Sequence, residues 1–225
     1  MKRKDLSLIA GIALCTLTVL LTVIYVMSPA PPEETLYIPP CDTDSDTADA
    51  IRAVTENGYM TLFNVDGSAY FYPEQTVKRG ELAVILTNLI PLSADHSAES
   101  ALGIADEGTI PPSQLPAVRA ALREGYMKLY GDYTFRPAEP LTREEAADVL
   151  GSLCKISVST GKSETIEDLD TISPHFRDNT KKMIELGIMQ GANGLFRPKD
   201  AITRKELALV IYRITESEYF IQRKS

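Results

Sequence analysis

The sequence has no tryptophan, and its 225 residues include only three cysteines and two histidines. The histidines, His96 and His175, are far apart, and no nearby cysteine or aspartate gives the spacing of a metal site or of a nucleophile–base pair. The adjacent residues Glu144-Glu145 point in different directions on a helix, which favours solvated charge or helix capping over an acid–base couple. We therefore expect no catalytic site, no metal and no cofactor, and we interpret the protein as a non-enzyme.

Positive charge is also in short supply. Lysine and arginine total 23 against 31 aspartates and glutamates, which gives a net charge of −8. Such an acidic chain argues against general binding to nucleic acids or to acidic lipid surfaces. Any anionic ligand must therefore be held by a small, local group of cations.

Charge is absent altogether from Leu6 to Met27, a run of 22 residues that follows a basic start at residues 1–5. This run is long enough to cross a bilayer as a helix, and the basic flank favours a cytoplasmic N-terminus. The alternative is a cleaved signal peptide, whose apolar part is normally shorter, and prolines follow the small residues Ser28 and Ala30 where cleavage would occur. We expect an uncleaved transmembrane anchor at residues 6–27, with everything after it extracytoplasmic.

Residues 28–47 are predicted to form an extended, acidic linker, because five of its first thirteen residues are proline. Its Asp42–Asp46 stretch resembles the start of a calcium loop. Thr47 and Ala53, however, occupy the places where glycine and glutamate are required, so an acidic linker that leads into a helix is the better interpretation.

Two cysteines, Cys41 and Cys154, follow the apolar run and are expected where disulfides persist, whereas Cys15 lies within the run. Nothing in the sequence fixes the distance between Cys41 and Cys154, so a disulfide between them stays open.

One motif occurs three times in the remaining chain. Each copy consists of Phe-x-Pro, an arginine six residues after the proline, and a glutamate two residues after the arginine. Copies 1, 2 and 3 are Phe71 to Glu81, Phe135 to Glu145 and Phe196 to Glu206, and their arginines are separated by 64 and 61 residues. Self-similarity at a nearly constant period is typical of repeat architectures, in which each unit buries an apolar face against its neighbours.

Helices are predicted on both sides of each Phe-x-Pro. Apolar residues spaced as on an amphipathic helix precede it, and Gly58, Gly125 and Gly187 follow where a left-handed C-terminal cap is needed. An apolar run after each arginine predicts a second helix, and Thr142 and Thr203 begin capping boxes there. The predicted fold class is mostly α, with three helix–loop–helix units. We expect the motif phenylalanines in the core and leave the nearby tyrosines open.

The recurring arginine stands at the start of the second helix, where a cation opposes the helix dipole at a cost of roughly 0.3–1 kcal/mol when exposed. Three occurrences of this choice indicate that each arginine meets an anion. One candidate is a carboxylate on a neighbouring unit. The other is an acidic ligand group, which a planar guanidinium binds in bidentate fashion, with helix N-terminal amides as further donors. The sequence alone leaves both open.

The order Phe-x-Pro, Ile-Thr-Arg-x-Glu and a short apolar helix, after a helix that ends at glycine, resembles the S-layer homology (SLH) domain. The resemblance covers about residues 48–216. It is strongest in the third copy, where Ile166-Glu167-Asp168-Leu169 and His175-Phe176 match the family's lead-in, with Phe176 in place of the family's tryptophan.

This resemblance implies three repeats, at residues 48–91, 101–156 and 165–216, in a pseudo-threefold bundle. It also implies binding of secondary cell-wall polysaccharide, typically through a pyruvylated and hence anionic sugar. The family's motif arginine contacts the ligand in the grooves between repeats, and its position here gives the glycan-binding residues, which are Arg143, Arg204 and Arg79. The first repeat departs from the pattern at Lys78, in place of the threonine, and at Gly80.

Two functions follow as expectations. The first is a single-pass, membrane-tethered module on the outside of the cell membrane, which engages an anionic glycan of the wall through Arg143 and Arg204, and weakly or not at all through Arg79. The alternative is a degenerate SLH scaffold that keeps the fold but acts as a structural component of the envelope or binds an envelope protein partner.

Overall fold

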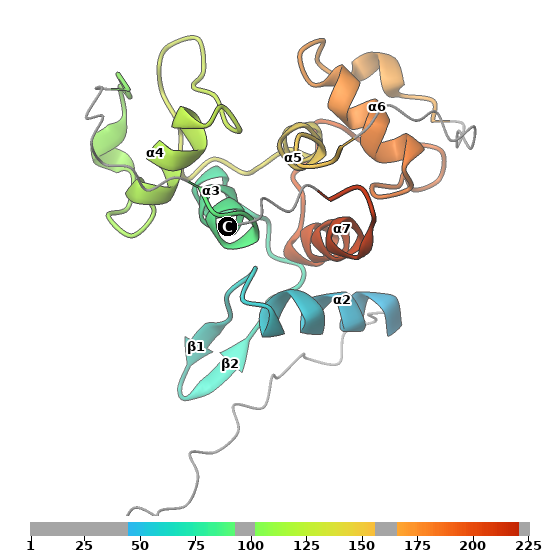
Figure 1. The fold of residues 1–225 in the computed structure, drawn as a ribbon, viewed down its shortest axis with the longest axis horizontal. Coiled ribbons are helices and arrows are strands. Elements are labelled where there is room, and N and C mark those ends of the chain that lie inside the picture. Colours follow the sequence, from blue (N-terminus) through green and yellow to red (C-terminus); the bar gives the residue numbers. More distant parts are fainter. Residues whose placement is uncertain (1–44, 93–101, 156–165, 221–225) are drawn as a thin grey trace, which may run out of the picture. The chain divides into compact units, whose positions relative to one another are not determined.

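The computed structural model describes residues 45–92, 102–155 and 166–220, all of which belong to one compact unit, Tyr37–Ser225 (Figure 1). Within this part of the chain no helix has both the length and the apolar character needed to cross a membrane. The expected anchor at residues 6–27, most of the expected linker at residues 28–47, and Cys41 lie outside the described residues. Cys154 is described and is a buried free thiol.

The described residues are mostly helical, which confirms the mostly α part of the predicted fold class. Six α-helices, two short 3₁₀ helices and two strands follow one another in the order α2 (Ser45–Glu56), β1 (Phe63–Val65), β2 (Ser68–Tyr70), α3 (Arg79–Leu89), η1 (Glu107–Thr109), α4 (Leu115–Arg123), α5 (Arg143–Gly151), η2 (Leu169–Thr171), α6 (Arg177–Glu185) and α7 (Arg204–Glu216).

Local sequence signals explain where most of these helices begin and end. Gly58, Gly125 and Gly187 adopt φ angles of 71°, 76° and 69° just after α2, α4 and α6, which confirms the predicted left-handed caps. Thr142 and Thr203 accept hydrogen bonds from the third amides of α5 and α7, which confirms both capping boxes. The same position before α3 is Lys78, whose side chain has no acceptor oxygen.

The sequence analysis did not predict the antiparallel hairpin β1–β2. Phe63 pairs with Tyr70 and Val65 with Ser68, around a turn at Asp66-Gly67 where both φ angles are positive (51° and 81°). Two left-handed residues in succession give the turn that matches the twist of paired strands. The loop between α2 and Phe71 therefore has a structure of its own.

Helices do not pair within the units that the sequence delimits. The contacting pairs are α3 with α4, α5 with α6, and α2 with α7 (Figure 1). Each of the first two pairs joins the second helix of one unit to the first helix of the next, and the third pair joins the last helix to the first. The chain therefore closes on itself through the contact of α7 with α2.

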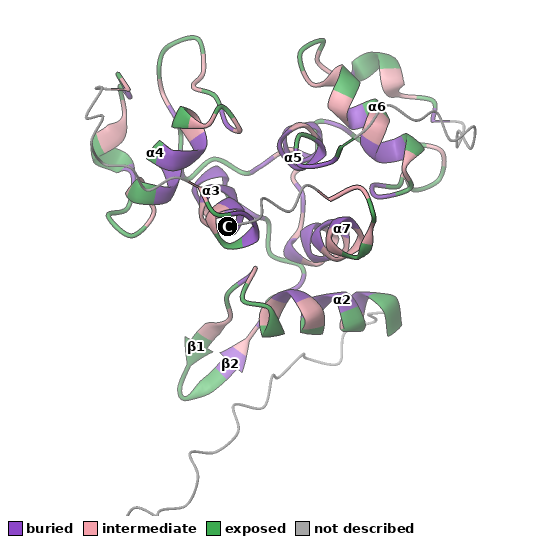
Figure 2. Ribbon diagram, in the orientation of Figure 1, coloured by how far each residue is buried: buried purple, intermediate pink, exposed green. Residues whose placement is uncertain are grey.

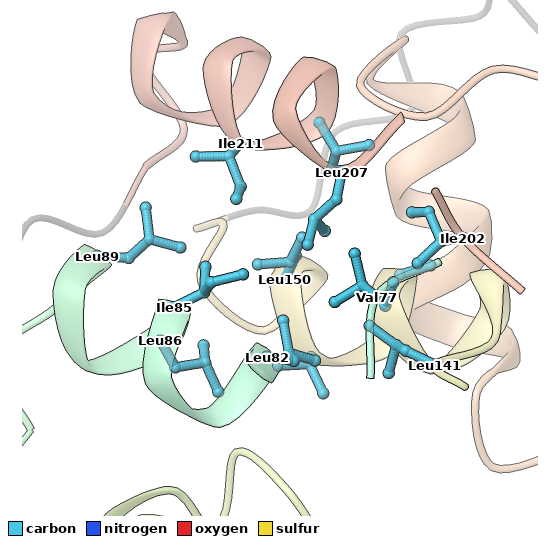
Figure 3. Packing of buried hydrophobic residues seen from close by; sticks show 14 of the residues in the cluster. Val77, Leu82, Ile85, Leu86, Leu89, Leu141, Leu150, Ile202, Leu207 and Ile211 are labelled. Atoms are coloured by element: carbon cyan, nitrogen blue, oxygen red, sulfur yellow. The ribbon is translucent and has the colours of Figure 1, made fainter. Parts of the chain in front are cut away.

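The centre of the core is a closed ring of three backbone hydrogen bonds just before α3, α5 and α7. The amide of Val77 donates to Ile202, that of Ile202 to Leu141, and that of Leu141 back to Val77, at 3.0, 2.9 and 2.8 Å. All three side chains are fully buried. Figure 3 shows them beside apolar side chains that converge from α3, α5 and α7. In Figure 2 these helices are largely buried, whereas β1 and its turn are exposed.

Candidate functional site

The three motif arginines are the first residues of α3, α5 and α7, and only 3–5% of each is exposed. Each side chain crosses to the Phe-x-Pro segment of another motif copy. We call these meeting places junction 1 (Arg79 with copy 2), junction 2 (Arg143 with copy 3) and junction 3 (Arg204 with copy 1). Nε donates to a motif phenylalanine carbonyl in all three, at Phe135 (2.9 Å), Phe196 (2.9 Å) and Phe71 (2.7 Å). Nη2 donates to a second carbonyl, at Lys128, Gln190 and Thr61.

At junctions 1 and 2 the guanidinium also meets a carboxylate of the same chain. Arg79 Nη1 lies 2.7 Å from Glu145 Oε1, and Arg143 Nη1 lies 2.8 Å from Glu206 Oε1. Both glutamates are the capping-box residues of the neighbouring copy, so one side chain caps a helix and neutralises an arginine. Of the two candidates that the sequence left open, the carboxylate on a neighbouring unit is therefore the partner of these two arginines. Burial lowers the pKa of Arg143, while the charge of Glu206 opposes that shift.

Junction 3 differs, because Arg204 forms no ion pair with any residue that the structure describes. The corresponding glutamate is Glu81, whose Oε2 accepts from the amide of Lys78. Burial lowers the pKa of Arg204, and the charge of Glu81 opposes this shift from a greater distance. Arg204 Nη1 has no hydrogen-bond partner among the described residues. It is not completely enclosed either, because in this part of the chain the one completely buried side-chain polar atom without a partner is Thr180 Oγ1. Arg204 Nη1 therefore reaches solvent.

The amides at the start of the second helices do not serve a ligand. The first two amides of each helix donate to carbonyls of the facing Phe-x-Pro segment, at Glu139 and Pro137 for α3, Asp200 and Pro198 for α5, and Gln75 and Pro73 for α7. The expectation that these amides supply further donors to an anion is therefore wrong. They are consumed in holding one copy of the motif to the next.

Two aspartates fix the Phe-x-Pro turns, and the sequence analysis did not assign them this role. Asp106 accepts from the amides of Phe135 and Arg136, and Asp168 accepts in the same way from Phe196 and Arg197, all at 2.7 Å. The middle residue of each turn, Tyr72 in copy 1, has a φ angle of 52–57°. A signal was present in the sequence, since each aspartate lies two residues after an isoleucine and 28 or 29 residues before the phenylalanine.

At junctions 2 and 3 the second residue of the helix that begins with the motif arginine pairs with the residue after the motif proline. At junction 2, buried Glu144 accepts from Lys199 and Ser173. At junction 3 the polarity is reversed, because Lys205 pairs with Glu74. Glu144 was expected to be a solvated or capping charge, and that is wrong because Lys199 and Ser173 hold it in the interior. Its neighbour Glu145 caps α5 as predicted.

At junction 1 the second residue is Gly80, and a side chain there would have to displace Gln114. A Cβ atom built there would lie 2.1 Å from Gln114 Oε1. Gln114 therefore fills the volume that a side chain occupies at the other two junctions. No charged pair is formed between the corresponding residues.

Aromatic rings line all three junctions. The motif phenylalanines are fully buried, as predicted, and each motif guanidinium lies 4.6–5.0 Å from the centre of one of them. At junction 1, Tyr130 lies between Arg79 and Arg136 and donates to Glu145 at 3.1 Å. Burial raises the pKa of Tyr130 to about 12. At junction 3 the additional ring is Phe63 of β1, 4.8 Å from the Arg204 guanidinium.

Two segments of the chain match a known protein family. The model of the S-layer homology domain matches residues 104–147 and 165–208, which contain Arg143 and Arg204. Two S-layer homology repeats are therefore detected in this chain. Residues 48–91, the expected first SLH repeat, lie outside both matches.

Two relatives point to the cell surface. The chain is 27% identical over 173 residues to the "Surface-layer 125 kDa protein" of Lysinibacillus sphaericus, a match that covers 75% of this chain and 14% of the relative. It is 30% identical over 102 residues to "Cell surface glycoprotein 1" of Acetivibrio thermocellus, which covers 44% of this chain and 4% of the relative. The chain thus spans only a small part of either relative. The SLH repeats and these similarities support a cell-surface, cell-wall-binding role.

Proposed function

We propose that this protein is a membrane-tethered, extracytoplasmic module that binds an anionic secondary cell-wall polysaccharide, pyruvylated in its acidic sugar. The two SLH repeats and the similarity to cell-surface proteins support the class of function. The proposal includes a first SLH repeat at residues 48–91, a pseudo-threefold bundle of three repeats, and a transmembrane anchor at residues 6–27. The protein is proposed to carry no enzymatic activity.

The observation that carries this proposal is the state of Arg204. A buried guanidinium without a counter-charge is costly, and an anion that arrives from outside removes that cost. Among the described residues no carboxylate pairs with Arg204, and its Nη1 reaches solvent. A carboxylate of the glycan is a suitable partner, because a guanidinium and a carboxylate form strong, charge-assisted hydrogen bonds.

The motif arginines are proposed to contribute unequally to glycan binding. Arg204 contributes most, because an incoming anion meets no competitor there. Arg143 and Arg79 contribute less, because the anion has to share each guanidinium with Glu206 or Glu145, which already lie at 2.8 and 2.7 Å. Repulsion between the ligand and these carboxylates opposes binding at both junctions.

Co-sedimentation with purified wall material tests the proposal. The full chain should sediment with walls that carry the acidic polysaccharide and should stay in solution with walls from which the acidic groups have been removed chemically. Arg204→Gln should lose retention, while Arg143→Gln should reduce it less. Circular dichroism and thermal unfolding of each variant show whether the fold is kept. An unaltered protein that fails to sediment with either kind of wall would reject glycan binding.

A second function is favoured by the ion pairs at junctions 1 and 2. Because Arg79 and Arg143 are neutralised within the chain, the protein is also a candidate degenerate SLH scaffold that binds an envelope protein or has a structural role. In that case a pull-down from solubilised membranes recovers one stoichiometric partner, and no glycan is retained. Binding to purified polysaccharide in the absence of any protein would exclude this alternative as the main function.

A further inference from the structure

A group of aromatic side chains at the hairpin β1–β2 lies outside the hydrophobic core. Tyr72, just after β2, stacks against Tyr70 with ring centres 5.6 Å apart and meets Phe63 edge-on at 5.5 Å. Tyr72 is 40% exposed, which makes it one of the few large hydrophobic side chains that are exposed among the described residues. Its backbone φ angle is 52°, held by the Phe-x-Pro turn. We call Phe63, Tyr70 and Tyr72 the hairpin aromatics.

These hairpin aromatics adjoin the unpaired cation of junction 3. The Phe63 ring centre lies 4.8 Å from the Arg204 guanidinium and 5.5 Å from the ring centre of Tyr72. The carbonyl of Thr61, just before β1, accepts from Arg204 Nη2 at 2.6 Å. The segment from Thr61 to Tyr72 therefore contacts Arg204 and also carries the exposed ring.

The other two junctions lack this combination. At junction 1 the aromatic ring of Tyr130 already contacts groups of the same chain. Its hydroxyl donates to Glu145, and the guanidinium groups of Arg79 and Arg136 lie against the ring. At junction 2 the loop between α6 and Phe196 contains no other aromatic residue and turns tightly at Asn193-Gly194. In both cases the motif arginine is already paired with a glutamate. Only junction 3 joins a solvent-reaching, unpaired guanidinium to an exposed aromatic ring within the described part of the chain.

We infer that junction 3 is the principal glycan site, and that it binds a carboxylate-bearing sugar through Arg204 while an adjacent pyranose ring stacks on Tyr72. This inference rests on the proposed function and adds to it the position of the site and the second type of contact. The flat, apolar C–H face of a pyranose matches the face of an aromatic ring, and the carboxylate matches the guanidinium. Sites that bind small molecules commonly combine such an apolar surface with a few directed polar groups.

The chain contains a matched control for Tyr72. Tyr133, in the loop before copy 2, is also an exposed tyrosine with a left-handed backbone, at a φ angle of 61°. Asparagine tolerates this conformation, so Tyr72→Asn and Tyr133→Asn each remove a ring without imposing new backbone strain. Tyr72→Phe keeps the ring and removes only the hydroxyl group.

Calorimetric titration of the full chain with purified acidic wall polysaccharide tests the inference. Tyr72→Asn should weaken binding roughly tenfold, as the loss of a central aromatic contact does in other interfaces. Tyr133→Asn should bind like the unaltered protein, and Tyr72→Phe should keep most of the affinity. In proton NMR the stacked sugar should show upfield ring-current shifts that are absent with Tyr72→Asn.

The outcomes separate this inference from the function on which it rests. If Arg204→Gln abolishes binding but Tyr72→Asn does not weaken it, the stacking contact is overturned while glycan binding stands. If Tyr133→Asn weakens binding as much as Tyr72→Asn, or if Arg143→Gln weakens it more than Arg204→Gln, the assignment to junction 3 is overturned. If the unaltered protein does not bind the polysaccharide, the proposed function itself fails.

Discussion

Arg79 and Glu145 form an ion pair 2.7 Å long across junction 1, with side chains only 6% and 8% exposed. The guanidinium belongs to the first copy of the motif and the carboxylate to the second. Glu145 Oε2 also accepts from the amide of Thr142. One buried carboxylate thus holds two copies together and starts a helix, so its loss should affect both.

Glu145→Gln should lower the free energy of unfolding by about 3 kcal/mol, because it leaves the buried Arg79 without a counter-charge. Urea unfolding followed by circular dichroism measures this change. Glu139→Gln is the control, since Glu139 forms an exposed ion pair with Arg136 at 3.4 Å and should contribute less than about 1 kcal/mol. Equal losses of unfolding free energy in the two variants would show that the buried ion pair stabilises the protein no more than the exposed one.

Lys78→Thr should stabilise the protein by about 1 kcal/mol, because it supplies the missing side-chain cap at the start of α3. Lys78 already has the extended backbone that a capping residue needs, with φ of −100° and ψ of 156°. Its amide already donates to Glu81, so the threonine would complete a capping box. Thermal unfolding measures the gain, and Thr203→Ala provides the reverse comparison with a loss of similar size. A drop in stability with Lys78→Thr would contradict this account of the first copy.

Stability should fall at alkaline pH partly because of Tyr130. The pKa of Tyr130 is raised by burial from 10.0 to about 12, against the effect of the Arg79 charge. The unfolded chain therefore releases this proton at lower pH than the folded protein does. The stabilising contribution is complete below pH 10 and is lost as the pH rises from 10 towards 12.

Urea unfolding at a series of pH values above 9 tests this expectation. The free energy of unfolding should decline less steeply between pH 10 and 12 in Tyr130→Phe than in the unaltered protein. Because Tyr130→Phe also removes the hydrogen bond to Glu145, its stability should be lower at neutral pH. Parallel pH profiles for the two proteins would show that Tyr130 does not ionise late.

Reversal of the charges at junction 2 should show how much the ion pair between Glu144 and Lys199 contributes to stability. Glu144→Lys should destabilise the protein strongly, by about 3 kcal/mol or more, because it places two cations together at a buried position. Addition of Lys199→Glu should restore part of this loss. A double-mutant cycle based on urea unfolding measures the coupling between the two residues. No recovery in the double variant would mean that Glu144 acts through Ser173 alone.

Sequence patterns predicted the local features well. The apolar spacing gave the positions of α2, α4 and α6, the threonines gave the starts of α5 and α7, and the Phe-x-Pro motif gave three core phenylalanines. These features depend on residues close together in the chain. The hairpin was missed, although Asp66-Gly67 carries its turn signal, because its strands are only three residues long and lie in a mostly helical chain.

The partners of the arginines were harder to predict. Arg79 and Glu145 are 66 residues apart, and their pairing follows from which copies are neighbours in space rather than from either motif alone. The sequence indicated that each arginine meets an anion, yet it did not separate Arg204 from Arg143. That difference arises from the position of Glu81 relative to Arg204 and from the hairpin that supplies Phe63, and neither is encoded in the motif.

The hydrogen-bonded circuit of Val77, Leu141 and Ile202 has a consequence for shortened versions of this protein. Deletion of any one copy would leave one neighbouring copy with an amide, and the other with a carbonyl, that lacks its hydrogen-bond partner. It would also expose apolar surface that is buried in the intact protein. A second molecule carries the missing piece and is well suited to supply it. Fragments with two copies should therefore associate with one another, and the most divergent copy has to be kept even if it never meets a sugar.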